Sequence, residues 1–261
     1  MEVVYEDNHI IIVSKRSGEI VQGDKTGDTP LSETVKEYIK TKYQKPGNVF
    51  LGVVHRLDRP VWGLVVFART SKALTRLNKM FAEGEVHKTY WAVTGKPTPG
   101  PILRLAKRLR RLPEQGSPIP ADAPTRSLSR SLSQKGGENR ELEHWLVRNE
   151  KQNKSYAYDH EVPNSKHALL RYRVLAEGEN YDLVEVQLMT GRHHQIRCQL
   201  ATIGRTIKGD LKYGARRSNP DGSISLLARS IEFVHPVTKE VIRAEAALPD
   251  ELFKKLAEKQ L

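Results

Sequence analysis

The sequence predicts an α+β fold in which a mixed, mostly antiparallel central sheet carries flanking helices. Strand patterns dominate the 261 residues, and several of them adjoin directly. Residues 177–180 (Glu-Gly-Glu-Asn) form a turn-rich link of the kind that joins antiparallel strands. No internal repeat is present. The length allows one large domain or two small ones, and we expect a single domain over residues 1–261.

The chain opens with strand patterns at residues 2–5 and 9–14. A helical pattern follows, for which we expect Thr29 as N-cap, Pro30 at the first helical position and an end near Tyr43. One face of this helix is apolar and is expected to pack on the sheet: Leu31, Val35, Tyr38 and Ile39.

Two short apolar runs, 49–54 and 64–68, then predict buried strands on either side of a charged segment. A second helix follows them, with Thr70 or Ser71 as its cap and Gly84 at its C-terminal end.

The next strand pattern covers residues 87–93, where Tyr90 and Ala92 should face one way and Trp91 and Val93 the other. Later strand patterns are at 143–147, 154–158, 168–175, 181–188, 225–234 and 240–246. Two helical patterns accompany these strands, at 191–203 and from about Asp250.

Residues from about 97 to 139 differ from the rest of the chain. They are rich in proline, serine and arginine and carry few large apolar residues. We expect a basic loop or a disordered insertion here. Within it, residues 103–112 predict either a short basic helix that contacts a polyanion or a solvated charged loop.

The composition is strongly basic, with 43 Lys and Arg against 31 Asp and Glu, a formal net charge of +12 and a pI near 9.7. This excess favours nucleic acid as the partner, then an anionic membrane surface, with a merely basic soluble protein as the alternative. The single cysteine, Cys198, excludes an intramolecular disulfide and a cysteine-based zinc cluster. No apolar run is long enough for a membrane span, and the N-terminus lacks a signal peptide pattern, so we expect a cytoplasmic protein.

One carboxylate, Asp58, lies between the two apolar runs in the segment His55-Arg56-Leu57-Asp58-Arg59. An acid on a short loop between two core strands is held in place, which suits a reactive group. The alternative is ordinary turn chemistry, in which Asp58 caps backbone N–H groups.

A second polar cluster, Gly191 to Arg197, begins the helical pattern at 191–203. His193 and His194 should share one helix face with Arg197, near the positive end of the helix dipole. Such a face can hold a carboxylate ionised or bind a phosphate. The alternatives are a plain solvated turn and a metal site, although the histidines lack a partner motif. Asp210, in a later turn, is expected to be structural.

Together these residues resemble the RluA-type pseudouridine synthases. His55 to Gly63, followed by an apolar strand, is similar to the family's His-Arg-Leu-Asp motif, and Lys88 to Ala92 matches its Lys-x-Tyr-x-Ala motif. Gly191 to Arg197 and Gly209 to Gly214 match the remaining motifs. The resemblance covers most of residues 2–246 and implies the pseudouridine synthase fold with an RNA-binding cleft.

The resemblance also implies roles for single residues. Asp58 corresponds to the essential catalytic aspartate, Tyr90 to the tyrosine that packs on the target base, and Arg197 to the arginine paired with the aspartate. Arg56 corresponds to the arginine that enters the RNA stack when the uridine flips out. We expect further motif side chains to contribute to substrate binding: His55, Lys88, Arg192, His194 and Gln195.

The implied activity is isomerisation of uridine to pseudouridine in ribosomal or transfer RNA. No cofactor or metal is expected, and the protein should be a monomer without the N-terminal S4-type domain that many relatives carry. Two departures stand out: Val61-Trp62 replaces the family's Thr-Ser, and Ser14 to Gly18 replaces its Asn-Lys-Pro-x-Gly. The alternatives are a non-catalytic RNA-binding or ribosome-assembly protein on the same fold and a glycosidase, which lacks a second acid near Asp58.

Overall fold

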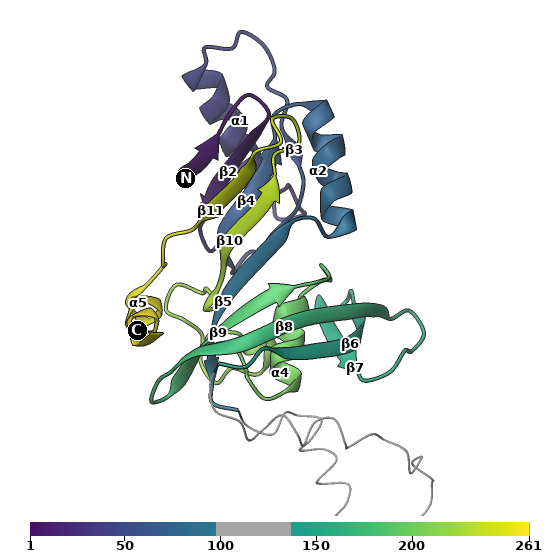
Figure 1. Ribbon diagram of the computed structural model, residues 1–261, viewed down its shortest axis with the longest axis vertical. Helices are drawn as coiled ribbons and strands as arrows, with labels where there is room; N and C mark the ends of the chain where they lie inside the picture. Colours follow the sequence, from purple (N-terminus) through teal and green to yellow (C-terminus); the bar gives the residue numbers. More distant parts are fainter. Residues whose placement is uncertain (98–136, 261) are drawn as a thin grey trace, which may run out of the picture.

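A computed structural model describes residues 1–97 and 137–260. Within them, one 11-stranded sheet runs through the molecule in the order β1-β2-β4-β10-β5-β9-β8-β6-β7, with β3 paired to β4 and β11 to β10 (Figure 1). The pair β4 and β10 is parallel, and the other described pairs are antiparallel. The predicted mixed, mostly antiparallel α+β fold is therefore confirmed.

The strands are β1 Glu2–Glu6, β2 Ile10–Lys15, β3 Gly52–Val53, β4 Trp62–Ala68, β5 His87–Gly95, β6 Arg140–Asn149, β7 Lys154–Tyr158, β8 Lys166–Glu177, β9 Tyr181–Leu188, β10 Leu226–Val234 and β11 Val241–Glu245. The described helices are α1 Leu31–Lys42, α2 Ser71–Glu83, α4 Gln195–Thr202 and α5 Glu251–Ala257, with short 3-10 turns η1 Leu211–Tyr213 and η2 Glu258–Gln260. Every strand predicted among the described residues is present. The basic insertion predicted at 97–139 and the helix proposed at 103–112 fall almost wholly on residues 98–136, outside the described part.

Both faces of the sheet are buried, which explains the uninterrupted apolar runs in β2 and β4. In β2, Ile11 and Val13 pack in one cluster with residues of α1 and α4, whereas Ile10 and Ile12 pack in another with residues of α2 and α5. Figure 1 shows α2 beside the upper half of the sheet and α4 beside β6 and β7 in the lower half. The same alternation places Tyr90 in the first cluster and Trp91 in the second, as predicted.

Helix α2 has the predicted ends: the Thr70 hydroxyl accepts the Ala73 N–H at 3.1 Å, and Gly84 closes the helix at φ +76°. The predicted start of α1 is wrong by one residue. Pro30 is itself the N-cap, in an extended conformation and without a side-chain capping bond. The first helical N–H groups need no hydroxyl cap because the Leu31 N–H donates to the Ile20 carbonyl at 2.7 Å.

The predicted strand at 49–54 is shorter than expected, since β3 contains only Gly52 and Val53. The chain then turns away from β4, and the His55 ring takes over the pairing by accepting the Val66 N–H at Nε2, 3.0 Å away. A side chain thus satisfies a backbone donor at the point where the strand ends.

The prediction that a helix begins at Gly191 is also wrong. Residues 191–194 form a turn, and α4 starts only at Gln195, after His194 in a left-handed conformation (φ 52°, ψ 28°). The Gln195 side chain causes this late start, since its Oε1 accepts hydrogen bonds from the Arg192 N–H and from the Thr190 hydroxyl, both at 2.9 Å. His193 and His194 therefore do not share a helix face with Arg197.

No helix in the two described ranges combines the length and the apolar character that crossing a membrane requires.

Candidate active site

A long cleft of about 1540 Å³ runs between the loop that follows β3 and the turn that precedes α4. This volume exceeds the 300–1,000 Å³ or so that is usual for small-molecule sites. Acidic side chains in the lining are Asp24, Asp58, Glu83 and Glu232, and they are outnumbered by the cationic ones: Arg56, Arg59, Lys88, Arg148, Arg192, Arg197 and Lys212.

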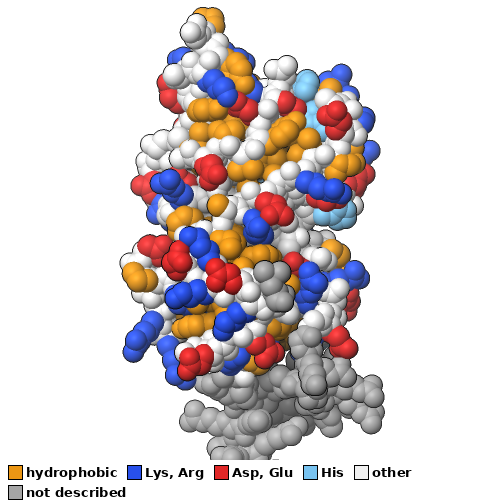
Figure 2. Space-filling view, turned by 60° about the vertical axis from the view of Figure 1, so that its left-hand side comes forward, with side chains coloured by type: hydrophobic (Ala, Val, Ile, Leu, Met, Phe, Trp, Pro, Cys, Tyr) orange, Lys and Arg blue, Asp and Glu red, His pale blue; other side chains and the backbone are white. Residues whose placement is uncertain are grey.

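On the face of the molecule in Figure 2, acidic and basic side chains are interspersed, with apolar ones between them. In the cleft, the excess of cationic side chains suits a large polyanion.

Asp58 lies on the floor of this cleft, on a loop that is held by backbone contacts. The Val61 N–H donates to the Asp58 carbonyl at 3.0 Å, which closes a tight turn. Lys15, at the end of β2, is 0% exposed and donates from Nζ to the carbonyls of Arg16, Arg59 and Val61 at 2.8–3.0 Å. A buried ammonium therefore ties the Asp58 loop to the central sheet.

Lys15 was not singled out from the sequence, where it appeared only within Ser14 to Gly18, a departure from the family motif. The available clue was a lysine at the end of the apolar strand Ile10 to Lys15, in phase with its buried residues.

Arg197 brings the two polar clusters together, as predicted. Its Nη1 lies 2.9 Å from Oδ2 of Asp58. Its Nε and Nη2 donate to the two oxygens of Asp210 at 2.7 and 2.9 Å, and Asp210 is only 1% exposed. Burial favours the neutral guanidinium, but the bonds to Asp210 and Asp58 outweigh it and raise the pKa of Arg197.

Asp210 is therefore structural, as expected, but in a specific way. A planar guanidinium with two bonds to one buried carboxylate has a fixed orientation, so Asp210 decides where Arg197 meets Asp58. The sequence could not reveal this pairing, because the two residues lie on different elements.

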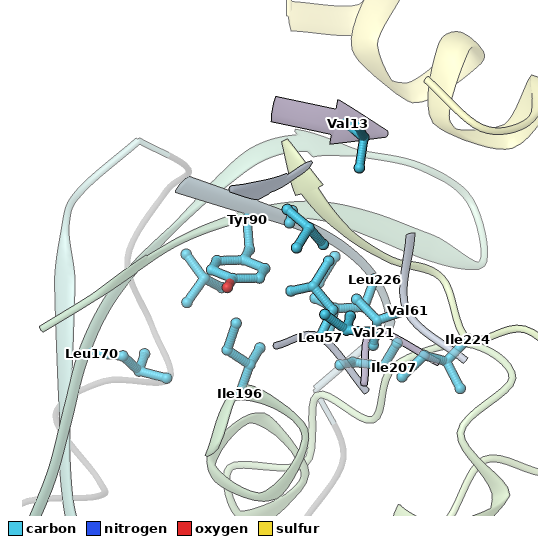
Figure 3. Close-up of a cluster of buried hydrophobic side chains, with 14 of the residues drawn as sticks. Val13, Val21, Leu57, Val61, Tyr90, Leu170, Ile196, Ile207, Ile224 and Leu226 are labelled. Carbon is cyan, nitrogen blue, oxygen red and sulfur yellow. The ribbon is translucent and has the colours of Figure 1, made fainter. Parts of the chain in front are cut away.

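Tyr90 lies on β5 and is nearly buried, in the apolar cluster drawn in Figure 3, which also contains Ile196. Burial raises the pKa of its hydroxyl, and the negative charge of Asp58 raises it further. The phenol is therefore neutral at physiological pH, and both Tyr90 and Asp58 line the cleft.

His194 also lies close to Asp58, near the same carboxylate oxygen that Arg197 contacts. Its Nε2 is 3.4 Å from Oδ2 of Asp58, and its Nδ1 is 3.1 Å from the hydroxyl of Tyr213 on η1. Burial is the main cause that lowers the pKa of His194 to about 3, so the ring is neutral at pH 7. Tyr213 was not singled out as a site residue from the sequence.

The other predicted binding residues also line the cleft. Arg56 is exposed at its surface, and Lys88 is half-buried with its Nζ 5.1 Å from the centre of the Phe81 ring. Arg192 is exposed and donates from Nε to the His167 carbonyl at 2.8 Å.

Two predicted binding residues have their polar atoms largely engaged within the protein. His55 accepts the Val66 N–H at Nε2 and stacks on Phe81 with ring centres 4.9 Å apart. Gln195 uses both amide atoms internally, since its Nε2 donates to the Leu169 carbonyl at 3.1 Å while its Oε1 braces the turn before α4. Contact of either residue with substrate stays a prediction.

No group of three or more His, Cys, Asp or Glu side chains within residues 1–97 and 137–260 is arranged to hold a metal ion.

Comparison with known proteins identifies similar sequences along almost the whole chain. The family model described as RNA pseudouridylate synthase matches residues 9–202. Uncharacterized RNA pseudouridine synthase YhcT of Bacillus subtilis is 30% identical over 258 residues, which cover 97% of this chain and 70% of that protein. Ribosomal large subunit pseudouridine synthase D of Vibrio cholerae is 28% identical over 267 residues, covering 97% of this chain and 68% of that protein.

A solved structure supports the fold. Human RNA Pseudouridylate Synthase Domain Containing 4 superposes with a TM-score of 0.68 at 19% identity, covering 99% of this chain and 92% of that chain.

Proposed function

We propose that Asp58 is the catalytic carboxylate of an RNA-modifying isomerase, since the chain belongs to the RNA pseudouridylate synthase family. One observation carries the proposal: in a cleft with a cationic excess, Asp58 lies 2.9 Å from a guanidinium that a second, buried carboxylate holds in place. Membership of the family makes the chain an enzyme, so the non-catalytic and glycosidase alternatives lose their support.

The reaction explains why the site needs this pair. Conversion of uridine to pseudouridine breaks the bond from the sugar to the base nitrogen, turns the uracil, and joins the same sugar to a base carbon. An ionised carboxylate beside the sugar and base can attack as a nucleophile or accept a proton. Arg197 binds Oδ2 of Asp58 at 2.9 Å and fixes the position of the carboxylate. Atoms and electrons balance within the substrate, so the isomerisation requires no redox partner.

Tyr90 and Arg56 complete the proposed site. An aromatic ring at the cleft surface can stack on a uracil that has left its helix. Removing a base from a helix costs a few kcal/mol. Arg56 is exposed at the cleft and can fill the space that the flipped uridine leaves, which offsets part of that cost. His55, Lys88, Arg192 and Gln195 remain the proposed contributors to substrate binding around this pair. His194, which was also predicted to bind substrate, instead lies against Asp58.

The substrate proposed is ribosomal RNA, with transfer RNA as the alternative. The support is the printed name of a relative, ribosomal large subunit pseudouridine synthase D, which is similar over 97% of this chain. A cleft larger than a nucleoside fits a structured RNA. We further propose that the enzyme acts as a monomer in the cytoplasm.

Substitution of Asp58 tests the proposal. Asp58→Asn keeps the shape of the side chain but cannot act as a carboxylate, so it should form no measurable pseudouridine in RNA while its affinity for that RNA stays close to wild type. Asp24→Asn is the matched control, because Asp24 lines the same cleft without touching Arg197. Appreciable turnover by Asp58→Asn would refute the assignment. Mapping pseudouridine in total RNA from cells with and without the gene would identify the modified RNA.

A further inference from the structure

The geometry points to His194 as a positioning residue for Asp58. We propose that its ring donates a hydrogen bond from Nε2 to Oδ2 of Asp58, and that Tyr213 selects the ring tautomer able to do so. Oδ1 of Asp58 is thereby left as the oxygen presented to the substrate. This inference rests on the proposed function of Asp58 and deepens it. It concerns how the carboxylate is oriented and which of its oxygens reacts.

A chain of hydrogen bonds favours one tautomer of His194. The backbone N–H of Ser155, on β7, donates to the Tyr213 hydroxyl oxygen at 2.8 Å. Among the described residues, the Tyr213 hydroxyl hydrogen then has one acceptor, Nδ1 of His194 at 3.1 Å. A neutral imidazole that accepts at Nδ1 must carry its hydrogen on Nε2. That nitrogen faces Oδ2 of Asp58 at 3.4 Å, and an ionised carboxylate can only accept.

The surroundings of His194 keep the ring neutral. Desolvation is the main cause that lowers the pKa of His194, a residue that is only 8% exposed. The charge of Asp58 raises the pKa, whereas Arg197 and Lys212 lower it, and the His193 ring stacks on the His194 ring with centres 3.8 Å apart. Since the ring stays neutral, His194 can donate to Asp58 without transferring a proton to it at neutral pH.

The backbone supports the same conclusion. His194 has φ 52°, a left-handed conformation that is unfavourable for most residues with a side chain. Such conformations persist where surrounding contacts impose them, and they cluster at functional sites. Here Gln195 braces the turn through Thr190 and the Arg192 N–H. The result is a histidine ring directed at Asp58.

The two oxygens of Asp58 are therefore unequal. Oδ2 receives Arg197 at 2.9 Å and faces His194 at 3.4 Å. Oδ1 receives no hydrogen bond from any residue in the described ranges. The Arg197 bond and the hydrogen bond proposed from His194 would both fall on Oδ2, where they draw charge toward that oxygen and stop the carboxylate from rotating. Oδ1, which has no partner to lose, is free to approach the sugar or base.

The first test needs neither RNA nor turnover. The chain has nine histidines, so protein labelled with ¹⁵N-histidine gives few ring signals, and the signal missing from His194→Asn identifies His194. At pH 7, we expect a neutral ring with hydrogen on Nε2. In Tyr213→Phe, which removes only the hydroxyl, both tautomers should appear. A His194 ring with hydrogen on Nδ1, or on both nitrogens, in the wild-type protein would overturn the proposal even if the enzyme is active.

The second test is kinetic. His194→Asn suits the left-handed backbone and keeps an amide near the Nδ1 position, but it cannot reach Asp58. The variant loses one long hydrogen bond to a charged group. We therefore expect kcat to fall about tenfold with little change in KM. His194→Gln carries an amide N–H near the Nε2 position and should recover most of the rate.

Unfolding midpoints of the variants separate this role from a purely structural one. Wild-type kcat in His194→Asn, or equal losses in the Asn and Gln variants at equal stability, would refute the donor role. Absence of turnover in the wild-type enzyme on every RNA would refute the proposed function instead.

Discussion

Replacement of Asp210 by asparagine should show whether the orientation of Arg197 matters for catalysis apart from its effect on the stability of the fold. Asp210 is 1% exposed and makes two bonds to Arg197 at 2.7 and 2.9 Å. Asparagine has nearly the same shape but keeps one acceptor oxygen and no charge. Breaking a buried ion pair by removing one partner costs about 3–5 kcal/mol. Because one hydrogen bond to Arg197 can remain in Asp210→Asn, we expect the free energy of unfolding to fall by about 3 kcal/mol, the lower limit of this range.

The chain provides a matched control in Asp182. It is also 1% exposed, and it pairs with buried Arg205 at 2.8 Å and with Lys96 at 2.6 Å. Asp182→Asn should therefore cost a similar free energy of unfolding. Domains of this kind are usually stable by about 5–15 kcal/mol, so both variants should remain folded at 25 °C. Urea unfolding followed by circular dichroism measures both losses.

Activity should distinguish the two variants. Without Asp210, the Arg197 guanidinium loses the bonds that orient it, and its contact with Asp58 becomes loose. Loss of a residue that orients a metal ligand typically costs about 10- to 100-fold in affinity or activity. By analogy, we expect kcat for pseudouridine formation to fall by about 10- to 100-fold here. Asp182→Asn should keep kcat within about twofold of wild type, since its pair lies away from the reacting groups.

The kinetic comparison also provides the refutation. If Asp210→Asn loses the expected stability but turns over at the wild-type rate, Arg197 does not depend on Asp210 for its orientation. If both variants lose activity equally, the loss reflects general softening of the fold and not the position of Arg197.

The remaining predictions concern Lys15 and a close approach of two strands. Burial lowers the pKa of Lys15 to about 8, below the 10.5 of an ordinary lysine, so the unfolded chain binds more protons between these values and stability rises with pH there. From pH 7 to 9.5 the wild type should gain about 2 kcal/mol more than Lys15→Met in the free energy of unfolding. Equal pH profiles of the two proteins would contradict the lowered pKa of Lys15. Gly63→Ala should cost about 3 kcal/mol or more, because a Cβ at φ +116° would lie 2.3 Å from the Ala228 carbonyl oxygen. Gly84→Ala is the control, because a Cβ at this position (φ +76°) would have no heavy atom within 4 Å. It should cost only about 1–2 kcal/mol in the same unfolding assay. Similar losses at the two positions would show that the contact of Gly63 with β10 is unimportant.

Those parts of the fold that depend on local periodicity were predictable from the sequence. Alternation in β5 correctly assigned Tyr90 and Trp91 to opposite faces, because a strand has a side-chain period of two whatever lies above it. The ends of α2 were also predictable, since Thr70 and Gly84 act on neighbouring backbone groups. The proximity of Asp58 and Arg197 came from the family motifs, as they are 139 residues apart.

Features that depend on tertiary contacts were not predictable in this way. The N-terminus of α1 needs no hydroxyl cap because a carbonyl from residue 20 satisfies it, and no local pattern encodes that contact. The helical pattern at 191–203 gave no sign that the Gln195 side chain would hold its first four residues in a turn. Tyr213 and Lys15 were missed for the same reason: each acts on a partner that the chain brings close only after folding.

The replacement of the family's Thr-Ser by Val61-Trp62 shows how the Asp58 loop is held here. The backbone of Val61 holds the loop. Its N–H donates a hydrogen bond to the Asp58 carbonyl, and its carbonyl accepts a hydrogen bond from Lys15 Nζ. Its side chain is 2% exposed and packs in the apolar cluster that includes Leu57. A hydroxyl at this position would be buried among apolar groups, at a cost of about 1–3 kcal/mol. Val61→Thr should therefore lose stability in urea unfolding and gain no turnover. If the variant were more stable or faster, a hydroxyl here would support the loop, and Lys15 would not be sufficient to hold it.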